Sequence, residues 1–95
     1  MFEWDEAKRL ATLQKHSLDF IDAAEIFLQE HLLLAARSDV EDRKIAVGQL
    51  NGIFLAVIHT SRGDAIRIIT ARRARKHERE QCEAYVARRN PGDEK

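Results

Sequence analysis

The chain has 95 residues and a formal net charge of zero, and 44% of its residues are hydrophobic while 34% are charged. This length fits a single small domain, and the hydrophobic content excludes an intrinsically disordered chain. The single cysteine excludes an internal disulfide. No apolar stretch approaches the roughly 20 residues that span a bilayer, and the acidic start does not resemble a signal peptide. We therefore expect a soluble cytoplasmic protein that does not bind a membrane.

Two helices are predicted near the start of the chain. Asp5 is a suitable N-cap for a helix that runs to about Lys15, and residues 2–4 before it could form a short edge strand. Asp19 can cap a second helix, whose apolar side chains recur at helical spacing. These side chains are Phe20, Ala23, Ala24, Phe27 and Leu28. Both helices need a sheet against which to bury their apolar stripes.

The middle of the chain predicts antiparallel strands. Residues 31–36 form an apolar run that indicates a strand, and a polar connection follows over residues 38–42. Residues 43–50 and 53–60 flank Asn51-Gly52, which is a strong signal for a two-residue hairpin loop. A second turn over residues 61–64 leads into a strand over residues 65–72. We therefore expect a meander of three strands, which residues 31–36 join as a fourth.

The end of the chain completes the predicted fold. Composition favours a third helix over about residues 73–88, and Asn90-Pro91-Gly92 ends it. The fold class is then α+β: an antiparallel four-stranded sheet with the two N-terminal helices on one face and a C-terminal helix. We expect one domain over residues 1–90, followed by a frayed tail over residues 91–95.

The predicted register brings two arginines together. The Asn-Gly loop places Arg43 opposite Thr60, and a two-residue loop at residues 62–63 places Arg67 opposite Ile58. Because residues two apart on a strand point the same way, both arginines then lie on one face of the sheet. There they could bind an anionic ligand, or each could pair with an acid at the rim of the sheet.

Charge is distributed unevenly along the chain. Residues 1–30 hold seven acids and three bases, whereas residues 62–95 hold ten bases and six acids. The basic side chains where the last strand meets the last helix are Arg67, Arg72, Arg73, Arg75, Lys76 and Arg79. Guanidinium groups match phosphate oxygens with paired hydrogen bonds, and fixed cations stabilise the charge that develops on phosphate during RNA cleavage. A solvated, ion-paired surface is the alternative interpretation of this cluster.

Sequence motifs for a metal or a nucleotide are absent. The chain has no Cys-x-x-Cys pair, no His-Glu-x-x-His and no glycine-rich phosphate loop, and its four histidines are dispersed. An enzyme of this sequence would therefore work without a metal ion or a cofactor. Lys15 and His16 end the first helix, where positive charge also suits the helix dipole.

Two blocks of the sequence resemble the BrnT family of toxins. The first block comprises Phe2-Glu3-Trp4-Asp5, Lys8, Lys15-His16, Phe20, Ala23-Ala24 and Phe27, and the second comprises Thr60 to Asp64 and Ile66 to Ala74. With Glu78 and Tyr85 in the closing helix, the resemblance covers most of the chain. The chain departs from the family pattern at Thr12, Ser17 and His59, where asparagine, glycine and tyrosine are usual, and the change at Ser17 affects a helix C-cap.

The resemblance implies a fold, an activity and a partner. BrnT proteins are type II toxins with a RelE-like microbial ribonuclease fold, which cleave RNA without a metal ion and arrest translation. Each is neutralised by a BrnA antitoxin, whose ribbon-helix-helix part carries the complex to operator DNA, and a heterotetramer of two toxins and two antitoxins is expected. The basic residues of the family motifs fall here on Lys15, His16, Arg43, Arg67, Arg72 and Arg73. In that assignment Lys15 and His16 transfer protons or position substrate, and the four arginines hold the phosphate.

Two other functions fit the same sequence. A degenerate toxin could bind an antitoxin as a transcriptional co-repressor without cleaving RNA, and only an RNA-cleavage assay separates this module from the enzyme. A stand-alone nucleic-acid binder is the other possibility. It is disfavoured because the first third of the chain is acidic and because single-strand binders usually need exposed aromatic platforms.

Overall fold

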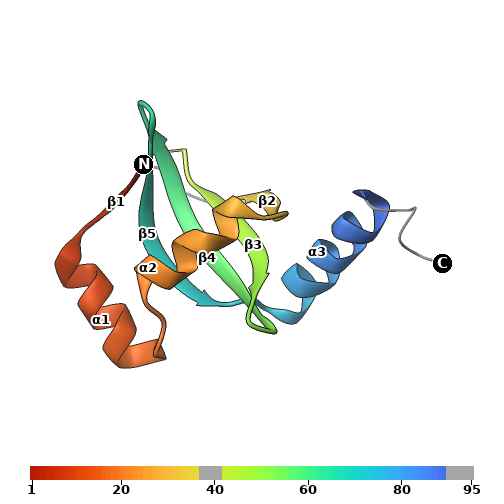
Figure 1. The fold of residues 1–95 in the computed structure, drawn as a ribbon, viewed down its shortest axis with the longest axis horizontal. Coiled ribbons are helices and arrows are strands. Elements are labelled where there is room, and N and C mark those ends of the chain that lie inside the picture. Colours follow the sequence, from red (N-terminus) through yellow and green to blue (C-terminus); the bar gives the residue numbers. More distant parts are fainter. Residues whose placement is uncertain (37–41, 90–95) are drawn as a thin grey trace.

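The structure, a computed structural model, describes residues 1–36 and 42–89 (Figure 1). In chain order its elements are β1 (Phe2–Trp4), α1 (Glu6–His16), α2 (Phe20–Ala23), the 3-10 helix η1 (Ala24–Leu28), β2 (Leu32–Ala35), β3 (Lys44–Leu50), β4 (Ile53–Arg62), β5 (Ala65–Arg73) and α3 (Lys76–Arg89). The predicted tail at residues 91–95, the helix stop at residues 90–92 and most of the polar connection at residues 38–42 lie outside the described residues.

The five strands form one mixed sheet in the order β1-β5-β4-β3-β2. The α+β class and the antiparallel meander with β2 beside it are confirmed. The prediction of a four-stranded, wholly antiparallel sheet is wrong, because β1 adds a fifth strand that pairs in parallel with β5, with Glu3 opposite Arg67. Parallel strands need a long connection, and here the whole segment from α1 to β4 separates the two. No local turn signal could therefore have revealed this pairing.

Both hairpins of the meander have two-residue loops. The Asn51-Gly52 loop is confirmed, and its residues have positive φ values of 52° and 82°, as a type I′ turn requires. The second loop lies one residue later than predicted, because Arg62 pairs with Ala65. Gly63 then takes the first loop position with a φ of 60°, which is the position that glycine occupies in a type II′ turn.

A β-bulge interrupts the pairing of β4 with β5. The register shifts between Ile58 and His59, where Ile69 is an extra residue on β5. Arg67 consequently lies opposite Thr60, and not opposite Ile58 as predicted. A bulge re-aims the side chains that follow it, so the residues of β5 after the bulge point to the opposite faces from those that simple alternation predicts.

The two faces of the sheet are packed by different helices. α2 and η1 lie across one face, which we call the covered face (Figure 1), and Phe20 and Ile26 on them are fully buried. The sheet residues in this core are Ala46, Leu55, Val57, Ile68 and Ala71. α3 packs on the opposite face, which we call the open face, near β2 and β3. There the Cys82 thiol donates a hydrogen bond to the carbonyl oxygen of Val47 at 3.2 Å.

The first two helices begin where their caps were predicted, and the bounds of all three helices differ from the predicted ones. Asp5 and Asp19 each accept hydrogen bonds from backbone N–H groups of the helix that follows. α1 ends at Ser17, whose φ of 57° is the left-handed conformation that glycine usually supplies. The second helix is shorter than predicted, because only four residues are α-helical before η1 continues the segment. α3 begins at Lys76, since β5 extends to Arg73.

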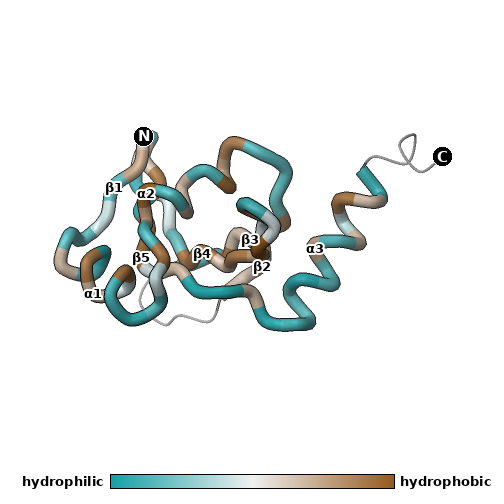
Figure 2. The backbone as a smooth tube through the Cα atoms, turned by 60° about the horizontal axis from the view of Figure 1, so that its bottom comes forward, coloured by the Kyte–Doolittle hydropathy of each residue, from teal (hydrophilic) through white to brown (hydrophobic). Residues whose placement is uncertain are grey.

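α3 contacts the sheet through a narrow strip. Figure 2 shows that most of this helix is hydrophilic, and its buried residues are Glu78 and Cys82. The pKa of the Cys82 thiol is raised by burial, which keeps the thiol protonated at neutral pH. Among the helices of the described residues, none is long and apolar enough to cross a membrane.

Candidate active site on the open face

Arg43 and Arg67 line one pocket. The pocket has a volume of about 270 Å³, and its lining residues are Asp5, Lys8, Arg43, Arg67, Ile68 and Ile69. Lys44 pairs with His59, so the preceding residue, Arg43, lies opposite Thr60. Thr60 in turn pairs with Arg67. The two arginines therefore share the open face as predicted, although the register of β4 and β5 differs by two residues from the one that led to this prediction.

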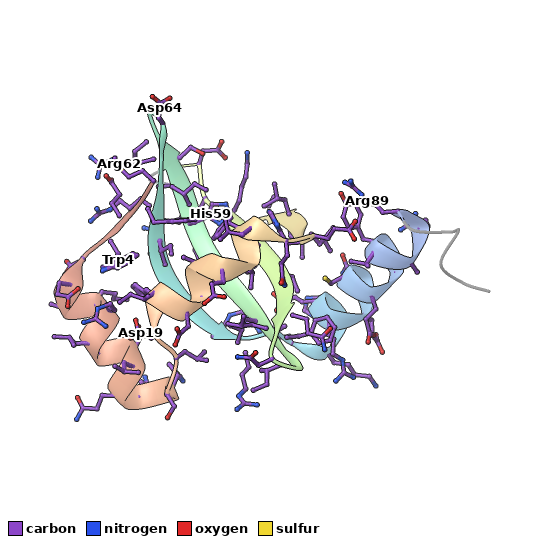
Figure 3. The ribbon with its side chains drawn as sticks, in the orientation of Figure 1. Trp4, Asp19, His59, Arg62, Asp64 and Arg89 are labelled. Atoms are coloured by element: carbon purple, nitrogen blue, oxygen red, sulfur yellow. The ribbon has the colours of Figure 1, made fainter. Side chains whose placement is uncertain are left out.

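Glu3 places a carboxylate beside these arginines. Because side chains alternate along a strand, Phe2 and Trp4 pack toward the covered face while Glu3 points to the open face. Its Oε1 lies 3.6 Å from Nη1 of Arg67 and 3.6 Å from Nη1 of Arg62. Figure 3 shows Arg62 at the upper end of β4, on the side of β1. This end of the open face thus holds one carboxylate between two guanidinium groups.

Lys8 is a cation that the sequence reasoning missed. It lies in α1, which packs along β5, and it lines the pocket with the two arginines. A signal for this placement was present in the sequence, because helical spacing puts Lys8, Thr12 and Lys15 on one stripe. Thr12 is the buried residue of this stripe, while Lys8 and Lys15 are exposed. Glu3 was missed because its strand was predicted only as an optional edge.

Lys15 and His16 lie apart from the pocket. Both are exposed in the last turn of α1, and neither lines the pocket that holds Arg43 and Arg67. Their place at the C-terminal end of a helix complements the helix dipole. The role in proton transfer or substrate positioning that was assigned to them stays a prediction.

Arg72 forms a two-pronged ion pair with Glu78. Its Nη1 donates to Oε1 at 2.8 Å and its Nη2 donates to Oε2 at 2.9 Å. Glu78 Oε1 also accepts the backbone N–H of Arg75 at 2.8 Å, so the carboxylate caps the start of α3. Glu78 is only 2% exposed, and the hydrogen bonds from Arg72 outweigh burial and lower its pKa to about 2. Arg72 therefore joins β5 to α3.

Arg73 lies on a different face from Arg67. It pairs with Leu55 of the buried core, and its own side chain is exposed. Without the extra residue at Ile69, simple alternation would have placed Arg73 on the same face as Arg67. The bulge places Arg72 there instead, and Arg72 is already paired with a carboxylate.

The histidine of the central strand is a core residue. His59 is 5% exposed, and its ring packs edge-on against Phe27 at 4.8 Å between ring centres. Burial lowers the pKa of His59, although a hydrogen bond between Nδ1 and the carbonyl oxygen of Val57 opposes the effect. Within residues 1–36 and 42–89, no group of three or more His, Cys, Asp or Glu side chains is placed to hold a metal ion.

The fold and the site define the class of this protein: a small α+β domain with one mixed sheet and a pocket lined by two arginines and a lysine. The chain belongs to the BrnT family, the ribonuclease toxins of type II toxin–antitoxin systems, whose sequence pattern matches residues 4–78. The match ends within the first turn of α3, so most of that helix lies beyond it.

A solved structure supports the same relationship. The crystal structure of the Brucella abortus ribonuclease toxin, BrnT, is similar to this chain with a TM-score of 0.66 and 38% sequence identity. The similarity covers 80% of this chain and 99% of that one. Comparison with curated proteins finds no match.

Proposed function

We propose that this protein is an endoribonuclease that cleaves RNA without a metal ion and thereby inhibits translation. The observation that carries the proposal is the convergence of Arg43, Arg67 and Lys8 on one pocket. Arg43 immediately precedes β3, Arg67 is in β5 and Lys8 is in α1, so the three residues come from distant parts of the sequence. The family of ribonuclease toxins to which the chain belongs supports this activity.

The pocket suits the chemistry of a phosphodiester. RNA cleavage by internal transfer adds negative charge to the phosphate as the 2′-oxygen approaches phosphorus. Guanidinium groups that are already in place stabilise this charge more than they stabilise the ground state. Arg43 and Arg67 would hold the phosphate oxygens, while the ammonium group of Lys8 adds a third positive charge.

The other basic residues predicted from the sequence take different roles in this proposal. Lys15 continues the stripe of Lys8 along α1, so we assign Lys15 and His16 to positioning the RNA strand outside the pocket. Arg73 is exposed and can contact a neighbouring phosphate. Arg72 acts through Glu78, since it fixes α3 to the end of β5.

The decisive experiment removes the two arginines of the pocket. Replacement of Arg43 and Arg67 by alanine should abolish growth arrest on induction in bacteria, and it should slow cleavage of RNA by the purified protein at least about 100-fold. The matched control replaces Arg79 and Arg88, two exposed arginines of α3, and should behave as wild type. A folded Arg43→Ala, Arg67→Ala protein that cleaves RNA at the wild-type rate would overturn the proposal.

Membership of a type II toxin–antitoxin family implies an antitoxin partner. We propose a BrnA-like antitoxin that binds operator DNA for the complex, a heterotetrameric assembly and a cytoplasmic location. If purified wild-type protein leaves RNA intact while its complex with the antitoxin still represses transcription, the protein is instead an inactive co-repressor module.

A further inference from the structure

We propose that Glu3 is the general base of the RNA cleavage, the group that takes the proton from the attacking 2′-hydroxyl. The inference rests on the proposed ribonuclease function. It assigns the removal of the 2′-hydroxyl proton to an acidic side chain, which was not among the basic site residues predicted from the sequence. Its geometric basis is the carboxylate of Glu3 beside Arg67, one of the two arginines that would hold the phosphate.

The strand β1 fixes where this carboxylate points. Phe2 packs against Phe27 at 5.6 Å between ring centres, and Trp4 packs against Phe20 at 6.2 Å. These two contacts hold both neighbours of Glu3 against the covered face, and alternation directs Glu3 to the open face. Arg67, which stands opposite Glu3 in the sheet, is also a lining residue of the proposed phosphate pocket.

The contacts of Glu3 leave it able to accept a proton. Its Oε1 is 3.6 Å from both Arg62 and Arg67, which is beyond the usual range of a hydrogen bond. Its side chain is 38% exposed, so a bound ribose can approach it. A carboxylate in this place has the chemistry that a general base needs.

The neighbouring titratable groups Asp5, Glu6 and His59 are hydrogen-bonded or buried. Asp5 is a lining residue of the pocket, whereas Glu3 borders it through Arg67. The Oδ1 of Asp5 accepts the N–H groups of Ala7 and Lys8 as the N-cap of α1. Glu6 is bound to Arg9 and to the indole N–H of Trp4. On the other side of the sheet, His59 is buried against Phe27 and cannot reach a substrate on the open face. Glu3 differs from these groups because it accepts no hydrogen bond among the described residues and lies beside Arg67 on the open face.

The proposed step moves one proton to Glu3 and exchanges one phosphorus–oxygen bond for another. Glu3 takes the proton of the 2′-hydroxyl, the 2′-oxygen forms a bond to phosphorus, and the bond from phosphorus to the 5′-oxygen breaks. The 5′-oxygen takes a proton from water, which leaves a 2′,3′-cyclic phosphate and a 5′-hydroxyl end. Glu3 then returns its proton to solvent. Arg43 and Arg67 balance the charge on the phosphate throughout.

A general base and a merely charge-balancing carboxylate predict opposite results for Glu3→Gln. The glutamine keeps the shape of the side chain but removes a negative charge near the phosphate, so RNA binding should be unchanged or tighter in either case. If Glu3 is the base, the cleavage rate should fall by about 100-fold to 10,000-fold. If Glu3 only balances charge, the rate should stay the same or rise.

The test uses the purified full chain and an RNA oligonucleotide that the wild type cleaves. Single-turnover rates are measured between pH 3.5 and pH 8, at pH values where each protein stays folded, and affinity is measured with the 2′-O-methyl form of the oligonucleotide, which cannot react. The wild-type rate should fall at acidic pH as the base is protonated, and Glu3→Gln should lose this acidic limb together with its activity. Glu3→Asp keeps a carboxylate, so it should retain the acidic limb at a reduced rate.

The control and the outcomes separate this inference from the proposed function. Glu25→Gln removes an exposed carboxylate from η1 on the covered face, and it should match wild type. Folding of each variant is checked by thermal denaturation. If wild type fails to cleave any RNA, the ribonuclease proposal fails. If wild type cleaves and a folded Glu3→Gln protein cleaves within about threefold of it with the same acidic limb, Glu3 is not the base.

Discussion

The ion pair between Arg72 and Glu78 should be a main support of α3, and its loss should be measurable as unfolding free energy. Glu78 is 2% exposed in the intact protein, and Arg72→Ala leaves its carboxylate with the N–H of Arg75 as its remaining hydrogen-bond donor of those described. Breaking a buried pair by removing one partner is strongly destabilising because an uncompensated charge stays behind. The same substitution was predicted from the sequence to remove a catalytic group, so the two roles have to be separated.

The magnitude follows from the pKa of Glu78. A pKa lowered from the ordinary value of 4.5 to about 2 corresponds to about 3 kcal/mol of differential stabilisation of the ionised form. Arg72 is itself 25% exposed in its side chain, and solvent screening reduces the value. We therefore expect Arg72→Ala to cost about 2–3 kcal/mol at neutral pH. Small domains have about 5–15 kcal/mol in total, so the loss would be a large fraction of the stability.

Urea denaturation of Arg72→Ala, Glu78→Ala and the double variant gives the coupling between the two side chains. The coupling should exceed about 1.5 kcal/mol, whereas Arg79→Ala on the exposed face of α3 should change stability by less than about 0.5 kcal/mol. Because the folded pKa of Glu78 is depressed, the contribution is complete above pH 4.5 and is lost as the pH falls toward 2. A coupling near zero, or a pair that is equally strong at pH 3 and pH 7, would refute this reasoning.

Two further predictions concern His59 and Ser17. The pKa of buried His59 is lowered from 6.5, so the stability contributed by its neutral form is complete above pH 6.5 and is lost as the pH falls further. The urea midpoint of unfolding should therefore fall between pH 7 and pH 5.5. His59→Phe should weaken this dependence of the midpoint on pH. Ser17 occupies the left-handed conformation at the end of α1, so Ser17→Gly should raise the unfolding free energy by about 0.5–1 kcal/mol; a lower melting temperature for the glycine variant would contradict this.

The caps, the first hairpin and the covered face could be predicted from the sequence. Asp5 and Asp19 start helices because their side chains accept N–H groups only two or three residues away. The Asn51-Gly52 loop depends on two adjacent residues that tolerate positive φ. The apolar stripe of the second helix was predicted to be buried. Phe20 is fully buried, whereas Leu28 at the end of the stripe is 79% exposed. All these signals act over a few residues and depend little on the rest of the chain.

The prediction that Arg43 and Arg67 share a face of the sheet was also correct, although it assumed the wrong register. The second hairpin loop lies one residue later than predicted, and this moves the partner of Arg67 by two positions. A shift by two leaves a side chain on the same face of a sheet, whereas a shift by one would have reversed it. The predicted face of Arg67 is therefore correct even though its predicted partner on β4 is wrong.

The remaining features were decided by tertiary structure. The parallel pairing of β1 with β5 aims Glu3 at Arg67, and the bulge at Ile69 exchanges the faces of Arg72 and Arg73. Glu78 then neutralises the arginine that reaches the open face. Sequence alone sets the local backbone preferences of each segment. Which distant segments become neighbours depends on how their apolar faces are removed from water together. That placement decides which cations line the pocket.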